Sequence, residues 1–125
     1  ATMAAEAEAL KAQGNLAFKE GKYDAAVQAF SSAITHDPNS AVLYSNRSGA
    51  LASLGKYSEA LIDAEKAVSL RPEWGKAYSR RAAAMYGMGR YEEAVETYRR
   101  GLEVEPENAQ MAQALTDVTS KLAEA

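Results

Sequence analysis

Five polar side chains in this sequence have the types and the spacing of an anion-binding site. Lys11 and Asn15 lie four residues apart, as do Lys76 and Arg80, so each pair shares one face if its segment is helical. Asn46 stands 34 residues before Arg80. The set holds three cations, two amides and no carboxylate. Charge-assisted hydrogen bonds from such donors contribute about 1.5–3 kcal/mol each.

An anion with two nearby carboxylates would match these five donors better than a single phosphate. A peptide C-terminus that ends in Asp carries both carboxylates, one on the main chain and one on the side chain. Capture of a terminal carboxylate is a known mode of peptide recognition. The alternative is that Lys11, Lys76 and Arg80 are ordinary solvated charges, which their joint spacing with two asparagines disfavours.

The elements that must position these residues repeat along the chain. The only three prolines are spaced by 34 residues, and tyrosines and alanines keep the same interval: Pro38, Pro72 and Pro106; Tyr23, Tyr57 and Tyr91; Ala26, Ala60 and Ala94. A fixed period of this size indicates stacked supersecondary units, and 34 residues is the period of the tetratricopeptide repeat, a helix–turn–helix hairpin.

The sequence predicts seven helices, at about 7–20, 24–35, 41–54, 58–70, 75–88, 92–104 and 108–122. Gly21, Gly55 and Gly89 suit the left-handed position after a helix, and each proline stops the second helix of a hairpin. Asp24 is the expected N-cap of the second helix. Glu103, Glu105 and Glu107 are interpreted as solvated charge.

We therefore expect an all-α, right-handed α-solenoid of three helix hairpins with a C-terminal capping helix. It forms one domain over 7–122, with repeats at about 7–40, 41–74 and 75–108 and the cap at about 108–122. Residues 1–6 are interpreted as a cloning remnant and lead-in, with Met3 as the native start.

In such solenoids the first helix of each hairpin lines the concave face, so equivalent positions point the same way. The five polar residues are then expected to converge at one end of a groove. Apolar positions on the same helices are candidates for contacts to the rest of a peptide: Phe18, Gly49, Ala52, Ala83 and Tyr86. Phe18, Gly49 and Ala52 could form a pocket for a Val or Ile, with Gly49 leaving room; Phe18 could equally be plain core.

Three segments carry a resemblance: KAQGN at 11–15, LYSNRS at 43–48 and WGKAYSR at 74–80. They resemble the carboxylate-clamp tetratricopeptide domains, and the chain is most similar to the N-terminal such domain of Hop-type organising co-chaperones, over about 8–122. The resemblance implies binding of the C-terminal Glu-Glu-Val-Asp of heat-shock protein 70, and possibly heat-shock protein 90. The terminal Asp would be held by Lys11, Asn15, Asn46, Lys76 and Arg80. Related domains often have Lys where this chain has Ser53, which leaves the choice between the two chaperones open.

Composition excludes several other functions. A chain of 125 residues with net charge −3 and pI near 5.2 disfavours nucleic acid as a partner. It has no cysteine, no apolar run of membrane-spanning length and no secretory signal, so we expect a cytoplasmic monomer. No phosphate loop or zinc spacing occurs, and the single histidine has no nucleophile partner. No cofactor, metal or enzymatic activity is expected.

Two alternatives stay open at this point. The chain could be a scaffold whose groove holds an internal helix of a partner, with the polar cluster incidental. It could also be the regulatory repeat domain of a larger enzyme.

Overall fold

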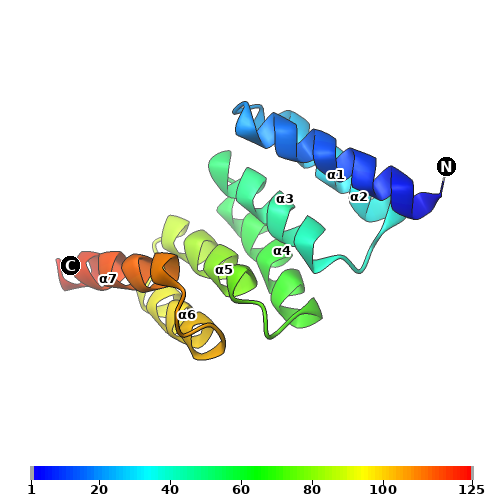
Figure 1. Cartoon of the computed structure of the whole chain (residues 1–125). Coiled ribbons are helices and arrows are strands. Elements are labelled where there is room, and N and C mark those ends of the chain that lie inside the picture. The colour runs from blue at the N-terminus through cyan, green and yellow to red at the C-terminus, as the bar shows by residue number, and fades with distance from the viewer. Residues whose placement is uncertain (1, 125) are drawn as a thin grey trace.

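The computed structural model describes residues 2–124, and in that range it contains seven helices and no strand (Figure 1). The helices are α1 (Met3–Lys19), α2 (Tyr23–His36), α3 (Ala41–Ser53), α4 (Tyr57–Leu70), α5 (Gly75–Gly87), α6 (Tyr91–Val104) and α7 (Ala109–Ala123). Each lies within a few residues of its predicted bounds. The predicted fold class is confirmed.

The helices pair in chain order and the pairs stack. α1 packs on α2, α3 on α4 and α5 on α6, while α7 covers α6. Successive hairpins meet through α2 with α3 and through α4 with α5, and α3 also contacts both α1 and α5. Figure 1 shows the result as a staircase with the two termini at opposite ends. The first helices of the three hairpins therefore follow one another along one side of the stack.

Helix ends follow local chemistry, with two departures from expectation. Gly21, Gly55 and Gly89 all have φ of +77°, the left-handed conformation predicted for them. α1 begins at Met3, before its predicted start, because Thr2 caps it by accepting the Ala5 N–H at 3.0 Å. The expected N-cap Asp24 instead lies inside the first turn of α2, and no side chain caps that helix.

Small residues let the two helices of each hairpin approach closely. Ala26, Ala60 and Ala94, one per second helix, are fully buried. The Ser48 hydroxyl donates a hydrogen bond of 2.8 Å to the Ala60 carbonyl, so even the buried polar group at this crossing is satisfied. Gly14 has no room for a Cβ because the Phe30 ring covers it. The hairpins therefore behave as fixed units.

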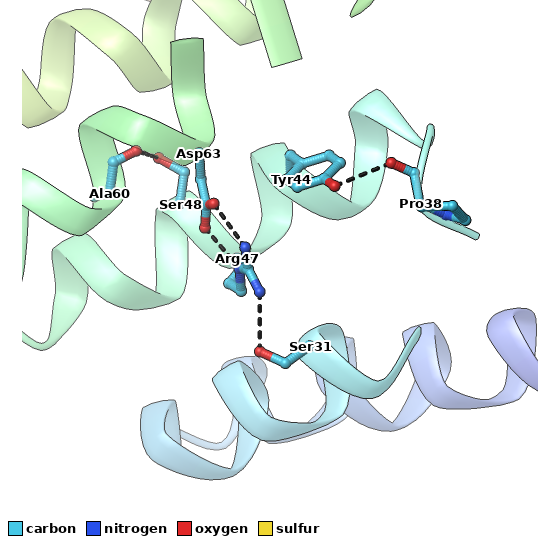
Figure 2. Close-up of polar contacts among 7 residues, drawn as sticks. All are labelled: Ser31, Pro38, Tyr44, Arg47, Ser48, Ala60 and Asp63. Atoms are coloured by element: carbon cyan, nitrogen blue, oxygen red, sulfur yellow. Dashed lines mark hydrogen bonds and ion pairs between the residues drawn. The ribbon is translucent and has the colours of Figure 1, made fainter. Parts of the chain in front are cut away.

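One arginine, Arg47, joins three helices. Arg47 on α3 donates from Nε and Nη2 to the carboxylate of Asp63 on α4, at 2.7 and 2.8 Å, and from Nη1 to Ser31 on α2 at 3.2 Å (Figure 2). Asp63 is almost fully buried. These hydrogen bonds raise the pKa of the Arg47 guanidinium above its ordinary value. The two-pronged bond to Asp63 holds α3 against α4 within the second hairpin, and the single bond to Ser31 joins that hairpin to the first.

We expect Asp63→Ala to lower the free energy of unfolding by about 3 kcal/mol. This is the low end for breaking a buried ion pair, because the Arg47 side chain is 24% exposed and can recover some solvent. Urea unfolding would measure it. Glu96→Ala, which removes an exposed carboxylate from α6, is the matched control and should change stability by less than about 0.5 kcal/mol. Equal stability of the two variants would contradict a structural role for the pair.

Candidate anion-binding groove

Four of the five predicted polar residues line one pocket. Asn15 on α1, Asn46 on α3 and Lys76 and Arg80 on α5 surround a space of about 210 Å³. Phe18 and Phe30 complete its lining with aromatic carbon. Residues from three hairpin-leading helices meet here because those helices lie next to one another. The result is a space with polar donors on its sides and an aromatic floor.

The α1 side of the pocket is partly satisfied within the chain. Asn46 Nδ2 donates to Asn15 Oδ1 at 3.3 Å, which leaves the amide protons of Asn15 and one of Asn46 for another acceptor. Lys11 lies one turn before Asn15 on α1 and is not among the residues lining the pocket. Its ammonium group pairs with Glu8 at 3.1 Å. An exposed pair of this kind is weak, so Lys11 remains able to exchange partners.

The α5 side carries uncompensated positive charge. Among residues 2–124, no carboxylate forms an ion pair with Lys76 or Arg80. Arg80 Nε is buried and has no hydrogen-bond partner in the same range. Burial lowers the pKa of the Arg80 guanidinium, and burial together with the neighbouring Arg80 charge lowers the pKa of Lys76. Two cations held together without a counter-charge would be stabilised by a bound anion.

A second pocket shares the same two cations. Lys76 and Arg80 also line a space of about 410 Å³ between α5 and α7, whose other lining residues are Ser79, Ala83, Asn108 and Gln110. Ser79, Asn108 and Gln110 were missed by sequence reasoning. Gln110 lies on α7 and Asn108 caps it, and α7 breaks the 34-residue period, so no equivalent position points to these two. Ser79 lies on α5, where its counterpart one repeat earlier is another serine, Ser45, so spacing alone did not mark it as a pocket residue. The one feature of the sequence that could have pointed to this pocket is Asn108, which caps α7 by accepting the Met111 N–H at 2.9 Å.

The predicted side-chain pocket residues do not gather at one place. Phe18 lines the first pocket and packs edge-on against Tyr23, with ring centroids 5.3 Å apart, and Ala83 lines the second pocket. Ala52 is half-buried against the main core. Tyr86 is 40% exposed, and its ring packs against the ring of Tyr91. The remaining position, Gly49, lies beneath the guanidinium group of Arg80.

The interpretation of Glu105 as solvated charge is wrong. Its Oε2 accepts the Gly75 N–H at 2.7 Å, and its Oε1 accepts from Asn108 at 3.1 Å. These bonds lower the pKa of the Glu105 carboxyl. A Cβ at position 75 would lie 2.5 Å from the Glu105 carboxyl carbon, so Gly75 is needed for the contact. Glu105 thereby ties the first turn of α5, which carries Lys76, to the start of α7.

The fold and the groove define a class: a solenoid of helix hairpins whose leading helices bring cations and amides to one pocket. Family models described as "Tetratricopeptide repeat" match residues 7–40, 40–71 and 75–108. The chain belongs to the tetratricopeptide repeat family. Among curated proteins, it is similar to the Hsp70-Hsp90 organising protein of Plasmodium falciparum, 63% identical over 49 residues. That match covers 39% of this chain and 19% of the relative.

Two solved structures are similar over nearly the whole chain. The first tetratricopeptide domain of Spaghetti (RPAP3), bound to the HSP90 peptide SRMEEVD, is 39% identical with a TM-score of 0.90 and covers 96% of this chain and 98% of that one. The second such domain of human RPAP3, in complex with the HSP70 peptide SGPTIEEVD, is 33% identical with a TM-score of 0.84. It covers 94% of this chain and 95% of that one.

Across residues 2–124 no cluster of three or more His, Cys, Asp or Glu side chains is placed to hold a metal ion. Over the same residues no helix has both the length and the apolar character needed to cross a membrane.

We expect Arg80→Met to leave the free energy of unfolding unchanged or to raise it by up to about 1 kcal/mol. The substitution removes a partly buried cation with an unsatisfied Nε and keeps an unbranched side chain of similar reach. Chemical denaturation would measure the change, with Arg100→Met on the exposed face of α6 as the control. A clear loss of stability in Arg80→Met alone would mean that Arg80 is a structural residue rather than a binding residue.

Proposed function

We propose that this chain is a co-chaperone module that binds the free C-terminus of heat-shock protein 70, and also of heat-shock protein 90, through a two-carboxylate clamp. The observation that carries the proposal is the pair of uncompensated cations, Lys76 and Arg80, facing the amides of Asn15 and Asn46 across one pocket. A terminal Asp carries two carboxylates on one residue, one on the main chain and one on the side chain. It would neutralise both cations and accept the free amide protons.

The five residues would contact the ligand from two sides of the groove. Lys76 and Arg80 on α5 supply charge-assisted hydrogen bonds, and Asn15 and Asn46 supply oriented amide donors from α1 and α3. Lys11 joins them by exchanging Glu8 for the incoming carboxylate. The similar RPAP3 domains, solved with peptides that end in EEVD, support this reading of the ligand.

Residues upstream of the terminal Asp would extend from the first pocket into the second. Lys76 and Arg80 border both spaces, so an extended peptide can pass from one to the other. Phe18 in the first pocket and Ala83 in the second offer apolar surface to it. Ser53 is uncharged, and its hydroxyl is already engaged on its own helix, where it donates to the Gly49 carbonyl at 3.0 Å. Selectivity between the two chaperones then depends on weak contacts.

The proposed activity is binding without catalysis. The site consists of cations and amides, with no nucleophile placed beside a base. A chain of this kind acts as an adaptor that brings chaperones together in the cytoplasm, and the isolated domain is a monomer. The organising function belongs to a longer protein in the relatives, of which this chain matches a short part.

We expect a peptide ending in Ile-Glu-Glu-Val-Asp to bind as the free acid with a dissociation constant on the order of micromolar, since a disordered tail must be ordered. The same peptide as its C-terminal amide should bind at least tenfold more weakly, because one clamped carboxylate is gone. Isothermal titration calorimetry measures both constants. A Met-Glu-Glu-Val-Asp peptide then ranks the two chaperones.

Equal binding of the acid and the amide would contradict the clamp and favour a groove that holds an internal partner helix. Salt provides an independent check. We expect the affinity of the acid peptide to fall as ionic strength rises, since the central contacts are ionic. Affinity that does not change between low and high salt would contradict an ionic site.

A further inference from the structure

We infer that Gly49 is the positioning residue for Arg80. Because residue 49 has no side chain, the flat face of the Arg80 guanidinium group packs on α3 at this point, and the edge of the group is turned into the pocket. This packing contact is the seat of Arg80. This inference rests on the proposed function and concerns the same site. It replaces the expectation that Gly49 makes room for an aliphatic side chain of the ligand.

The contact between Gly49 and Arg80 is the basis for the inference. A Cβ built at position 49 would lie 2.8 Å from Arg80 Cζ and Nη1 and 3.1 Å from Nη2. Three atoms at nearly equal distance mean that the plane of the guanidinium group faces the point where a Cβ of residue 49 would lie. Carbon atoms in proteins do not approach so closely, so any side chain at this position must push Arg80 away. The space above Gly49 is therefore already filled.

Arg80 needs this contact because no hydrogen bond holds its side chain in one conformation. Arg80 Nε has no partner, and nothing else among the described residues pairs with the guanidinium charge. A long cationic side chain without a hydrogen bond would otherwise sample several rotamers. Van der Waals contact with the α3 backbone restricts it to one. The ligand then meets an Arg80 that is already in place, and the free energy of binding is not spent on ordering it.

Glycine at this position has a known cost, which makes its presence informative. Gly49 lies in the interior of α3 and has no positive φ that would require glycine. Glycine in a helix interior is the least favourable residue after proline. The neighbouring Ser53 hydroxyl also bonds to the Gly49 carbonyl. Alanine at 49 should therefore stabilise the helix while it displaces Arg80, so folding and binding change in opposite directions.

The test is Gly49→Ala, measured for both folding and binding. We expect the thermal midpoint to rise by about 3–5 °C, from helix propensity and from release of the Arg80 side chain. We expect the affinity for the acid Ile-Glu-Glu-Val-Asp peptide to fall at least about fivefold, because one charge-assisted hydrogen bond is misplaced. Ser69→Ala, at an exposed position of α4, is the control for helix propensity and should leave affinity unchanged.

Two measurements separate a seat for Arg80 from a pocket for the ligand. If Gly49 seats Arg80, the variant loses the same factor for a peptide ending in Glu-Glu-Ala-Asp as for one ending in Glu-Glu-Val-Asp. Loss confined to the Val peptide would overturn the inference and restore the aliphatic pocket. In an Arg80→Met background, Gly49→Ala should change affinity by less than twofold, as measured by NMR shift titration, which reaches millimolar constants.

The failure of this inference is distinguishable from failure of the proposed function. If the unmodified chain binds neither acid peptide, the proposed function fails. If the unmodified chain binds and Gly49→Ala binds equally well, the clamp stands and the role of Gly49 is wrong. The Nε–H resonance of Arg80 gives a further readout: it should shift in the unliganded Gly49→Ala variant and stay unchanged in Ser69→Ala.

Discussion

Close approach of the two helices within each hairpin is the constraint on which the groove depends. Ala26, Ala60 and Ala94 have no exposed surface, and their small side chains let each second helix lie tightly under its first helix. Arg47 bonds to Asp63 within the second hairpin and to Ser31 on the first, and so joins the two hairpins. With hairpins held in this way, α1, α3 and α5 follow one another along a single side. Four side chains from three separate helices reach one pocket only because that arrangement is rigid.

The cations of the groove lower the stability of the fold but are already in place for a ligand. Lys76 and Arg80 are held beside each other without a counter-charge. Burial lowers the pKa of both groups, and the neighbouring Arg80 charge lowers the pKa of Lys76 further. The chain supports this unfavourable arrangement with favourable contacts nearby. Glu105 holds the first turn of α5 through Gly75, and Gly49 accepts the guanidinium face of Arg80. Functional residues that destabilise a fold are typical of binding sites. Here a bound anion would supply the counter-charge that Lys76 and Arg80 lack in the free chain.

Periodicity made much of this predictable, and its limits explain the rest. The 34-residue interval predicts the helices, and it relates Asn46 to Arg80 as equivalent positions in adjacent repeats. It could not place Gln110 as a pocket residue, because α7 departs from the repeat. It also did not single out Ser79 on α5, whose counterpart one repeat earlier is another serine. It also could not assign Glu105, whose partner Gly75 is 30 residues earlier and bonds through the backbone. The seat under Arg80 depends on one rotamer crossing from α5 to α3, and sequence spacing does not specify rotamers.

The most direct test of the central claim is a crystal structure of this chain with a peptide ending in Glu-Glu-Val-Asp. The account predicts both carboxylates of the terminal Asp within hydrogen-bond distance of Asn15, Asn46, Lys76 and Arg80, with the Lys11 ammonium turned from Glu8 toward the ligand. The Arg80 guanidinium should remain on Gly49. A peptide bound elsewhere, or one whose terminal carboxylates contact solvent instead of these side chains, would contradict the account.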